Sequence, residues 1–380
     1  MQTMHPVIVS GRHVVDTALF PGDEFEERLR QTRQLMDTHR LDGLVVYGNG
    51  EHSAALTYLT NLAPRMRWAL AFVPCQGDIE LVVAGPERDL HFSHATSWVK
   101  NLTAYDKLDL VVRRWADALR AAVGHDSLRV GFAGGEHVRQ CVLDDVAQCL
   151  GQQADAWVDF DAELDQQMER LRPRQVRAIR NNLAGLGATV TVAREVVSSG
   201  GKAADAARAA EKAGLLYGAH EVRTLFSRDG GMTLQPFERI EPESSSVFAG
   251  YIARRELGHW AEAFVSHNVT PTQAQEIIDA LSRMVAAAKD GALVGDIEQL
   301  RGTRLPGAKQ HPFAARAVAM LGLAIQEKAP NDKLQAGGIY SMRAGLIFEE
   351  QTAAIGSVVV LVNDSSAEIL LESHPVAIRS

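Results

Sequence analysis

Two periods of hydrophobic and polar positions divide the first 160 residues into helices and strands. Between Asp23 and Arg40, apolar residues recur among charged ones at near-helical spacing, which predicts an amphipathic helix. Short apolar runs predict buried strands, and two longer amphipathic stretches predict further helices. The strands are expected at residues 41–47, 68–74, 79–84 and 129–132, and the helices at 108–123 and 137–150. Strands that alternate with helices are typical of an α/β domain.

The pattern changes near residue 165. A long helical stretch follows, in which Pro173 suits the first position of a helix, and an alanine-rich helix is expected at 202–217. After Gly218, short apolar runs dominate and predict strands with a few helices between them. The strands are expected at 222–227, 246–253, 259–266, 346–355, 357–362 and 367–371, and the helices at 271–289 and 294–301. We therefore predict an α+β second domain and divide the chain into residues 1–164 and 165–380.

Charge and composition narrow the class of protein. The 380 residues carry a net charge of −8 and no run of Lys or Arg, which argues against a nucleic-acid partner. No apolar stretch approaches the roughly 20 residues of a membrane-spanning helix, and the first residues lack the pattern of a signal peptide. Cys75, Cys141 and Cys149 form no CxxC pair and no disulfide framework. We expect a cytoplasmic protein that binds neither nucleic acid nor membrane.

Familiar catalytic motifs are missing from the sequence. It contains no GxxxxGK[ST], GxSxG, HExxH or GxGxxG segment. Gly48-Asn-Gly50 follows an expected strand, but two glycines there are typical of a turn. Phosphoryl and hydride transfer therefore have no support from motifs, and we expect no cofactor.

Several loose motifs, taken in order, resemble the creatinase/prolidase/aminopeptidase P family. The resemblance covers most of the chain, and each motif is weak alone, so the argument depends on their order and spacing. The segments are 25–62, which contains Tyr58-Leu-Thr-Asn61 where the family has YLTG, 172–218, Gly258-His-Trp-Ala-Glu-Ala-Phe264, Gly322-Leu-Ala-Ile-Gln-Glu-Lys-Ala-Pro330 and Leu334-Gln-Ala-Gly-Gly-Ile-Tyr340. The resemblance implies an α/β N-terminal domain followed by an α+β "pita-bread" domain, and a homodimer with shared sites.

The chain departs from this family at the metal ligands. Metal-dependent members hold two ions with two Asp, one His and two Glu. Carried over by position, these ligands fall at Tyr251, Glu262, Ala319, Arg343 and Glu350. Hard divalent ions need several oxygen or nitrogen ligands, and a guanidinium repels them. We therefore expect a site without metal, in which Arg343 pairs with Glu262 or Glu350.

Two carboxylates are the main candidates for acid–base chemistry. Strand alternation places Trp260, Glu262 and Phe264 on one face, where Glu262 is either a desolvated functional acid or an exposed residue beside edge aromatics. Glu349 and Glu350 must point to opposite faces. The resemblance selects Glu350, although the pair also fits a plain polar interruption of a strand.

Other polar residues complete the candidate site. His259 and Tyr251 are candidate proton-transfer groups near Glu262, and imidazole is the readiest proton shuttle near neutral pH. Arg343 either binds a substrate anion or replaces the lost metal charge. The remaining substrate-binding candidates are Gln326 and His311 in and before the GLAIQE segment, and Arg65 and Arg67, whose region in creatinase-like members resembles a segment that reaches the neighbouring subunit's site.

Three classes of function remain open at this stage. The first is a metal-independent, creatinase-like hydrolase that cleaves a C–N bond of a small polar metabolite, or a related lyase or isomerase of a specialised pathway. Creatinase itself matches incompletely, because Leu234-Gln235 precedes Pro236 where the family often has His. The second is a non-catalytic binding protein on a peptidase fold. The third, a peptidase with unusual metal ligands, conflicts with Ala319 and Arg343 together.

Overall fold

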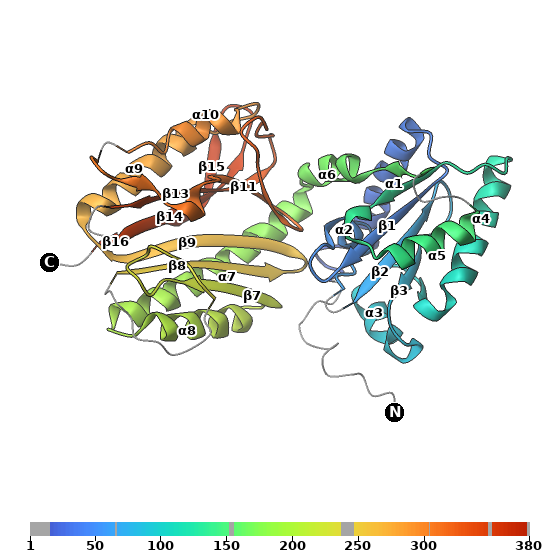
Figure 1. Cartoon of the computed structure of the whole chain (residues 1–380), viewed down its shortest axis with the longest axis horizontal. Coiled ribbons are helices and arrows are strands. Elements are labelled where there is room, and N and C mark those ends of the chain that lie inside the picture. Colours follow the sequence, from blue (N-terminus) through green and yellow to red (C-terminus); the bar gives the residue numbers. More distant parts are fainter. Residues whose placement is uncertain are drawn as a thin grey trace. The chain divides into compact units, whose positions relative to one another are not determined.

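The computed structural model describes residues 16–64, 67–151, 156–236, 247–303, 305–348 and 352–377. The chain forms two compact units, Met1–Met168 and Glu169–Ser380. Figure 1 shows the elements of each unit. The boundary expected from the sequence, at residue 165, falls inside helix α6 (Asp161–Glu169). Among the described residues, no helix is long and apolar enough to cross a membrane.

The first unit is built on a mixed six-stranded sheet. Its strand order is β4-β3-β2-β1-β5-β6, in which β1 pairs in parallel with β5 and antiparallel with β2. The strands are β1 (Gly43–Asn49), β2 (Trp68–Pro74), β3 (Glu80–Val83), β4 (Asn101–Ala104), β5 (Val130–Ala133) and β6 (Val158–Asp159). The helices besides α6 are α1 (Gly22–Thr38), α2 (Ala54–Thr60), α3 (Leu90–Thr96), α4 (Leu108–Val123) and α5 (Gln140–Leu150). The expected α/β alternation is confirmed, while the short β4 and β6 were not predicted.

Helix α4 packs closely against this sheet. Its apolar stripe, including Val112, Trp115 and Leu119, is fully buried against the sheet. The Trp115 ring lies where a side chain on Gly43 of β1 would have to go. Only glycine therefore permits this packing at position 43.

The second unit contains two sheets. One has the order β16-β9-β8-β7, and the other has the order β12-β11-β13-β14-β15 with β10 paired to β13. Their strands are β7 (Glu221–Phe226), β8 (Phe248–Glu256), β9 (His259–Val269), β10 (Lys309–Gln310), β11 (Val318–Leu321), β12 (Ile325–Glu327), β13 (Ile339–Ile347), β14 (Ala353–Val362), β15 (Ala367–Ser373) and β16 (Val376–Ala377). The predicted strand over 346–355 spans the end of β13 and the start of β14.

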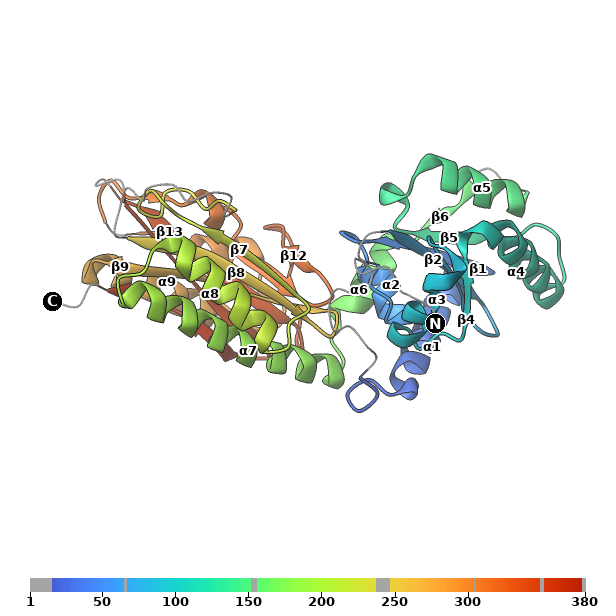
Figure 2. The ribbon, with the colours of Figure 1, turned by 90° about the horizontal axis from the view of Figure 1, so that it is seen from below.

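Helices cover the outer faces of these two sheets. Helices α7 (Pro173–Ser198) and α8 (Ala203–Leu216) lie along β7, β8 and β9, whereas α9 (Pro271–Ala287) and α10 (Val294–Gln299) lie along the other sheet (Figures 1 and 2). Pro173 does begin α7, as expected. Helix α9 begins with a capping box, in which the Thr270 hydroxyl accepts a hydrogen bond from the Gln273 N–H at 3.2 Å.

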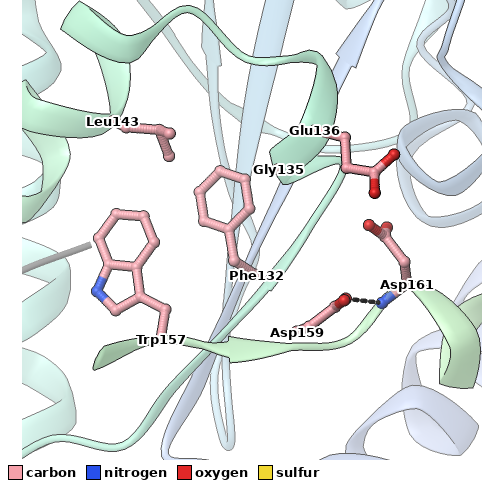
Figure 3. A pocket seen from close by; sticks show the side chains of 7 residues that line it. All are labelled: Phe132, Gly135, Glu136, Leu143, Trp157, Asp159 and Asp161. Carbon is pink, nitrogen blue, oxygen red and sulfur yellow. Dashed lines mark hydrogen bonds between the residues drawn. The ribbon is translucent and has the colours of Figure 1, made fainter. Parts of the chain in front are cut away.

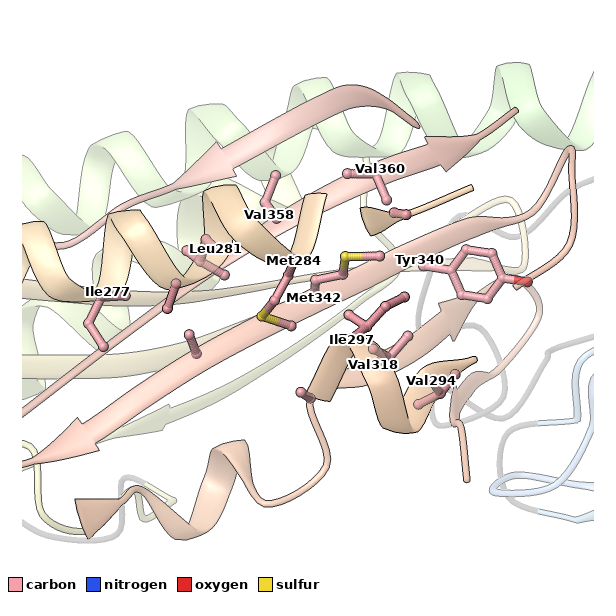
Figure 4. Packing of buried hydrophobic residues seen from close by; sticks show 14 of the residues in the cluster. Ile277, Leu281, Met284, Val294, Ile297, Val318, Tyr340, Met342, Val358 and Val360 are labelled. Carbon is pink, nitrogen blue, oxygen red and sulfur yellow. The ribbon is translucent and has the colours of Figure 1, made fainter. Parts of the chain in front are cut away.

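Strand β13 separates an apolar core from a polar layer. Its residues Tyr340 and Met342 face α9, where Figure 4 shows them among Ile277, Leu281 and Met284. Alternate residues of β13 point the other way, towards β9. Because the register pairs Arg343 with Ser357 of β14, and the Ser357 hydroxyl accepts a hydrogen bond from β9, this second face is the layer between the two sheets.

Candidate functional site

Neighbouring strands bring Tyr251 and Glu262 together in the layer between the sheets. The β8–β9 register pairs Tyr251 with Phe264 and Ala253 with Glu262, so all four share one face. This confirms that Trp260, Glu262 and Phe264 alternate onto a common face. Glu262 is only 1% exposed, whereas Tyr251 is partly exposed. Of the two residues, Tyr251 is therefore the more exposed.

The guanidinium of Arg343 lies against the Glu262 carboxylate. Its Nη1 is 3.8 Å from Glu262 Oε1, and both side chains are buried. Arg343 also pairs through Nη2 with Glu327 of β12, and its Cζ lies 5.3 Å from the centre of the Phe264 ring. Among the described residues, Glu262 Oε1 has no hydrogen-bond partner. The layer thus contains a buried ion pair with one unfilled acceptor.

The environment of Tyr251 keeps its phenol protonated. Burial raises the pKa of Tyr251 well above its usual range, and the charge of Glu262 and a hydrogen bond to it act in the same direction. The cations Arg343 and Arg223 oppose this shift of the pKa. The ring packs against Phe264 with 4.8 Å between centroids. At neutral pH, Tyr251 is therefore neutral and donates a hydrogen bond to Glu262.

The residues present do not fit a two-metal centre. Of the positions carried over from the family, Ala319 lies on β11 opposite Ser341, and Arg343 lies opposite Ser357 of β14. Within the described part of the chain, these positions offer the Glu262 carboxylate, a phenol and hydroxyls around a guanidinium that also pairs with Glu327, which is a poor donor set for hard divalent ions. Among the described residues, no group of three or more His, Cys, Asp or Glu side chains could hold a metal.

Two other candidates, His259 and Gln326, face away from this group, whereas His311 lies beside Gly345 of β13. His259 falls on the opposite face of β9 from Glu262, where its Nδ1 lies 2.9 Å from the Leu257 carbonyl oxygen. His311 is fully buried, with its ring nitrogens bonded to Gly231 O at 2.8 Å and to the Phe313 N–H at 3.2 Å. Gln326 pairs with Met320, so it faces away from the polar layer.

No contact between the remaining candidates and the Tyr251 group is described. Arg67 lies in the first unit, where its Nη1 donates to the Ala84 carbonyl at 3.3 Å. Arg65 and Glu350 lie outside the described residues. Their roles, and those of the other candidates, stay predictions.

Sequence reasoning missed three residues of the layer. Glu327 pairs with Ala319, and its carboxylate contacts Arg343. The Ser357 hydroxyl accepts from the Phe264 N–H at 2.9 Å, and the buried Ser341 hydroxyl has no partner among the described residues. Ser341 lies two residues before Arg343 on the same strand, so the alternation of strand residues could have indicated it. The positions of Glu327 and Ser357 depend on the pairing between strands.

The first unit contains a separate cavity of about 240 Å³ at the ends of β5 and β6. Phe132 and Trp157 stack along one side with 5.0 Å between centroids, and Glu136, Asp159 and Asp161 lie on the other (Figure 3). Burial raises the pKa of Asp161, although a hydrogen bond from the Gly134 N–H opposes the shift. No motif in the sequence indicated this cavity.

Comparison with known proteins identifies the fold. No family model and no curated protein matches the sequence. Among solved structures, the chain is similar to the prolidase from Pyrococcus horikoshii OT3, with 12% identity over 91% of this chain and 98% of that one and a TM-score of 0.72. It is also similar to dipeptidase PepE from Mycobacterium ulcerans, with 16% identity over 96% of this chain and 99% of that one and a TM-score of 0.67. The X-Pro aminopeptidase from Thermotoga maritima MSB8 is also similar, with 12% identity over 92% of this chain and 99% of that one and a TM-score of 0.69.

These similarities confirm the predicted architecture. The chain has the pita-bread fold with an N-terminal α/β domain, as in the prolidase and aminopeptidase P structures. At 10–16% identity across the structures compared, the likeness shows the fold alone.

Proposed function

We propose that this chain is a metal-independent enzyme on the pita-bread fold that hydrolyses a C–N bond of a small polar metabolite. The observation that carries the proposal is the buried Tyr251–Glu262–Arg343 group. A tyrosine whose pKa is strongly perturbed and that lies beside a paired carboxylate and cation is a candidate functional group, because perturbed pKa values cluster at functional sites. The fold is shared with hydrolases, which supports a hydrolytic reaction.

The three side chains would have different roles. Tyr251 would be the catalytic residue, because it is the more exposed of the three. Its phenol would give a proton to the leaving nitrogen as water adds to the carbon, and would regain a proton from that water. Glu262 is a positioning residue that acts through Tyr251, since its own carboxylate is almost fully buried. Arg343 balances the charge of Glu262 at 3.8 Å without needing a metal ion. The same groups would also serve a lyase or isomerase step.

A non-catalytic binding protein is the second candidate. The near-complete burial of Glu262, Arg343, Ser341 and Ser357 favours it, because buried groups offer a substrate little access to reactive atoms. In that case Tyr251 would contact a ligand without transferring a proton. The homodimer and the roles of Arg65, Arg67 and Glu350 stay predictions from the sequence resemblance, and the cytoplasmic location stays a prediction from the cysteine pattern and the first residues.

The test compares turnover by the full chain and by Tyr251→Phe. Release of an amine, ammonium or urea is measured with creatine, N-acetylglycine and Gly-Pro as probes, with and without EDTA. We expect turnover of at least one probe that EDTA does not affect and that Tyr251→Phe lowers by about a hundredfold or more.

Tyr105→Phe is the matched control. Tyr105 also donates to a carboxylate, Asp145 at 2.8 Å, and its pKa is also raised, to about 12, but it lies in the first unit. Turnover that EDTA abolishes and Mn²⁺ restores would contradict metal independence. Saturable binding of a probe with no turnover would favour the binding protein.

A further inference from the structure

A chain of polar contacts joins the end of α7 to the end of β9. The Ser198 hydroxyl lies 2.9 Å from His267 Nε2, and His267 Nδ1 lies 2.9 Å from Asn268 Oδ1. Alternation along β9 places His267 on the opposite face from Glu262. This cluster is therefore separate from the Tyr251 group and independent of the proposed function.

The order of these contacts defines which atom carries the proton. An amide oxygen only accepts hydrogen bonds, so Asn268 Oδ1 holds the imidazole proton on Nδ1. His267 Nε2 is then the acceptor that faces the Ser198 hydroxyl. A nucleophile, a base and a group that orients the base, in that order, form the arrangement that activates a hydroxyl in hydrolases.

Local structure holds the base and exposes the nucleophile. Asn268 has a φ of 61°, and this left-handed backbone lets its side chain turn back onto the preceding ring. His267 is only 7% exposed, and contacts at both ring nitrogens hold its orientation. Ser198 is the last residue of α7 and is exposed. An outside reagent can therefore reach the hydroxyl while the imidazole stays behind it.

A cation lies one helical turn before the serine. Arg194 precedes Ser198 by four residues, which places both on the same face of α7. Its Nη2 donates to the His374 carbonyl at 2.6 Å, and its Nε has no partner among the described residues. A positive charge on this face of the helix would favour the negative charge that develops on a carbonyl oxygen during attack.

We propose that Ser198 is a nucleophile that accepts an acyl group from small esters. Ser198 Oγ bonds to the carbonyl carbon while its proton passes to His267 Nε2, and the alcohol leaves with that proton. Water then attacks the acyl-serine and gives a proton to His267. The serine oxygen leaves and takes this proton back, so that ester and water yield acid and alcohol.

The experiment treats the full chain with p-nitrophenyl acetate near pH 7.5. Release of nitrophenolate is followed, and the acetylated residue is located by peptide mass mapping. We expect acetyl on Ser198 in the wild type, and a rate more than about tenfold lower in Ser198→Ala. Ser199→Ala is the matched control, because Ser199 is an exposed neighbour whose hydroxyl bonds only to the Val196 carbonyl at 2.9 Å among the contacts described. It should react like the wild type.

Two further comparisons separate activation from mere exposure. Asn268→Asp should keep the reaction because it retains an acceptor for Nδ1, whereas Asn268→Ala should lose it and change its pH profile. In Ser198→Cys, the base should favour the thiolate, so iodoacetamide should react faster than with Ser199→Cys at pH 7. Equal alkylation of the two cysteines, or acetylation that is unchanged in Ser198→Ala, would overturn the proposal.

Discussion

The two faces of β13 are both buried, but one is apolar and the other is polar. Tyr340 and Met342 complete an apolar core under α9, whereas Ser341 and Arg343, their neighbours in sequence, line a layer of partly satisfied polar groups. On the apolar face, the contribution to the free energy of unfolding depends on how well the side chains fit together and fill the space. On the polar face, the energy depends on whether each charge keeps its partner. One strand therefore supports both the stability of the unit and its candidate chemistry.

Removal of the cation from the polar face should have the largest effect. Arg343→Met leaves Glu262 buried without the guanidinium 3.8 Å away, so we expect a loss of about 3–5 kcal/mol in the free energy of unfolding. Urea unfolding measures it. The double variant with Glu262→Gln should recover part of the loss, and a double variant as unstable as the single one would show that the pair is not coupled.

On the apolar face, Met342→Ala should cost about 2–5 kcal/mol. Met342 is fully buried in the cluster of Figure 4, so truncation leaves a cavity. The same unfolding experiment measures the loss. In contrast to Arg343→Met, the Glu262→Gln change should give no rescue here, and a rescue would mean that the two faces are not separate.

A smaller effect should depend on pH through His311, which lies beside Gly345 of β13. Burial lowers the pKa of His311, although its bond to Gly231 opposes the shift. The unfolded chain therefore binds a proton below about pH 6.5 that the folded chain rejects. Stability should fall as the pH drops below that value, and the fall should be weaker in His311→Gln. The exposed His125→Gln is the control, and an identical pH slope in all three proteins would contradict the argument.

The smallest change in stability is expected for Ser341→Ala. Its hydroxyl is buried with no hydrogen-bond partner among the described residues, so its removal should leave stability unchanged or raise it by up to about 1 kcal/mol. Thermal unfolding measures the shift in Tm. A clear loss of stability would show that the hydroxyl has a partner and that the polar face is better satisfied than described.

The faces of single helices and strands could be predicted from local patterns in the sequence. Contacts between residues on different strands could not, because they depend on the register of strand pairing. Alternation placed Glu262 with Trp260 and Phe264 correctly, because a strand sets its faces within a few residues. His259 was grouped with Glu262 by closeness in sequence, although an odd separation puts it on the other face. Ser357 and Glu327 meet Arg343 only through pairing across loops, and Ser198 meets His267 across 69 residues. No local pattern encodes such contacts.

The central claim is that the guanidinium of Arg343, 3.8 Å from Glu262, balances this carboxylate and that the proposed enzyme needs no metal ion. Metal content of the full chain, measured by mass spectrometry after equilibration with Mn²⁺, Co²⁺ and Zn²⁺ and removal of free ions, tests it directly. We expect no stoichiometric metal in the wild type or in Glu262→Gln. Two ions per chain in the wild type, lost in Glu262→Gln, would contradict it.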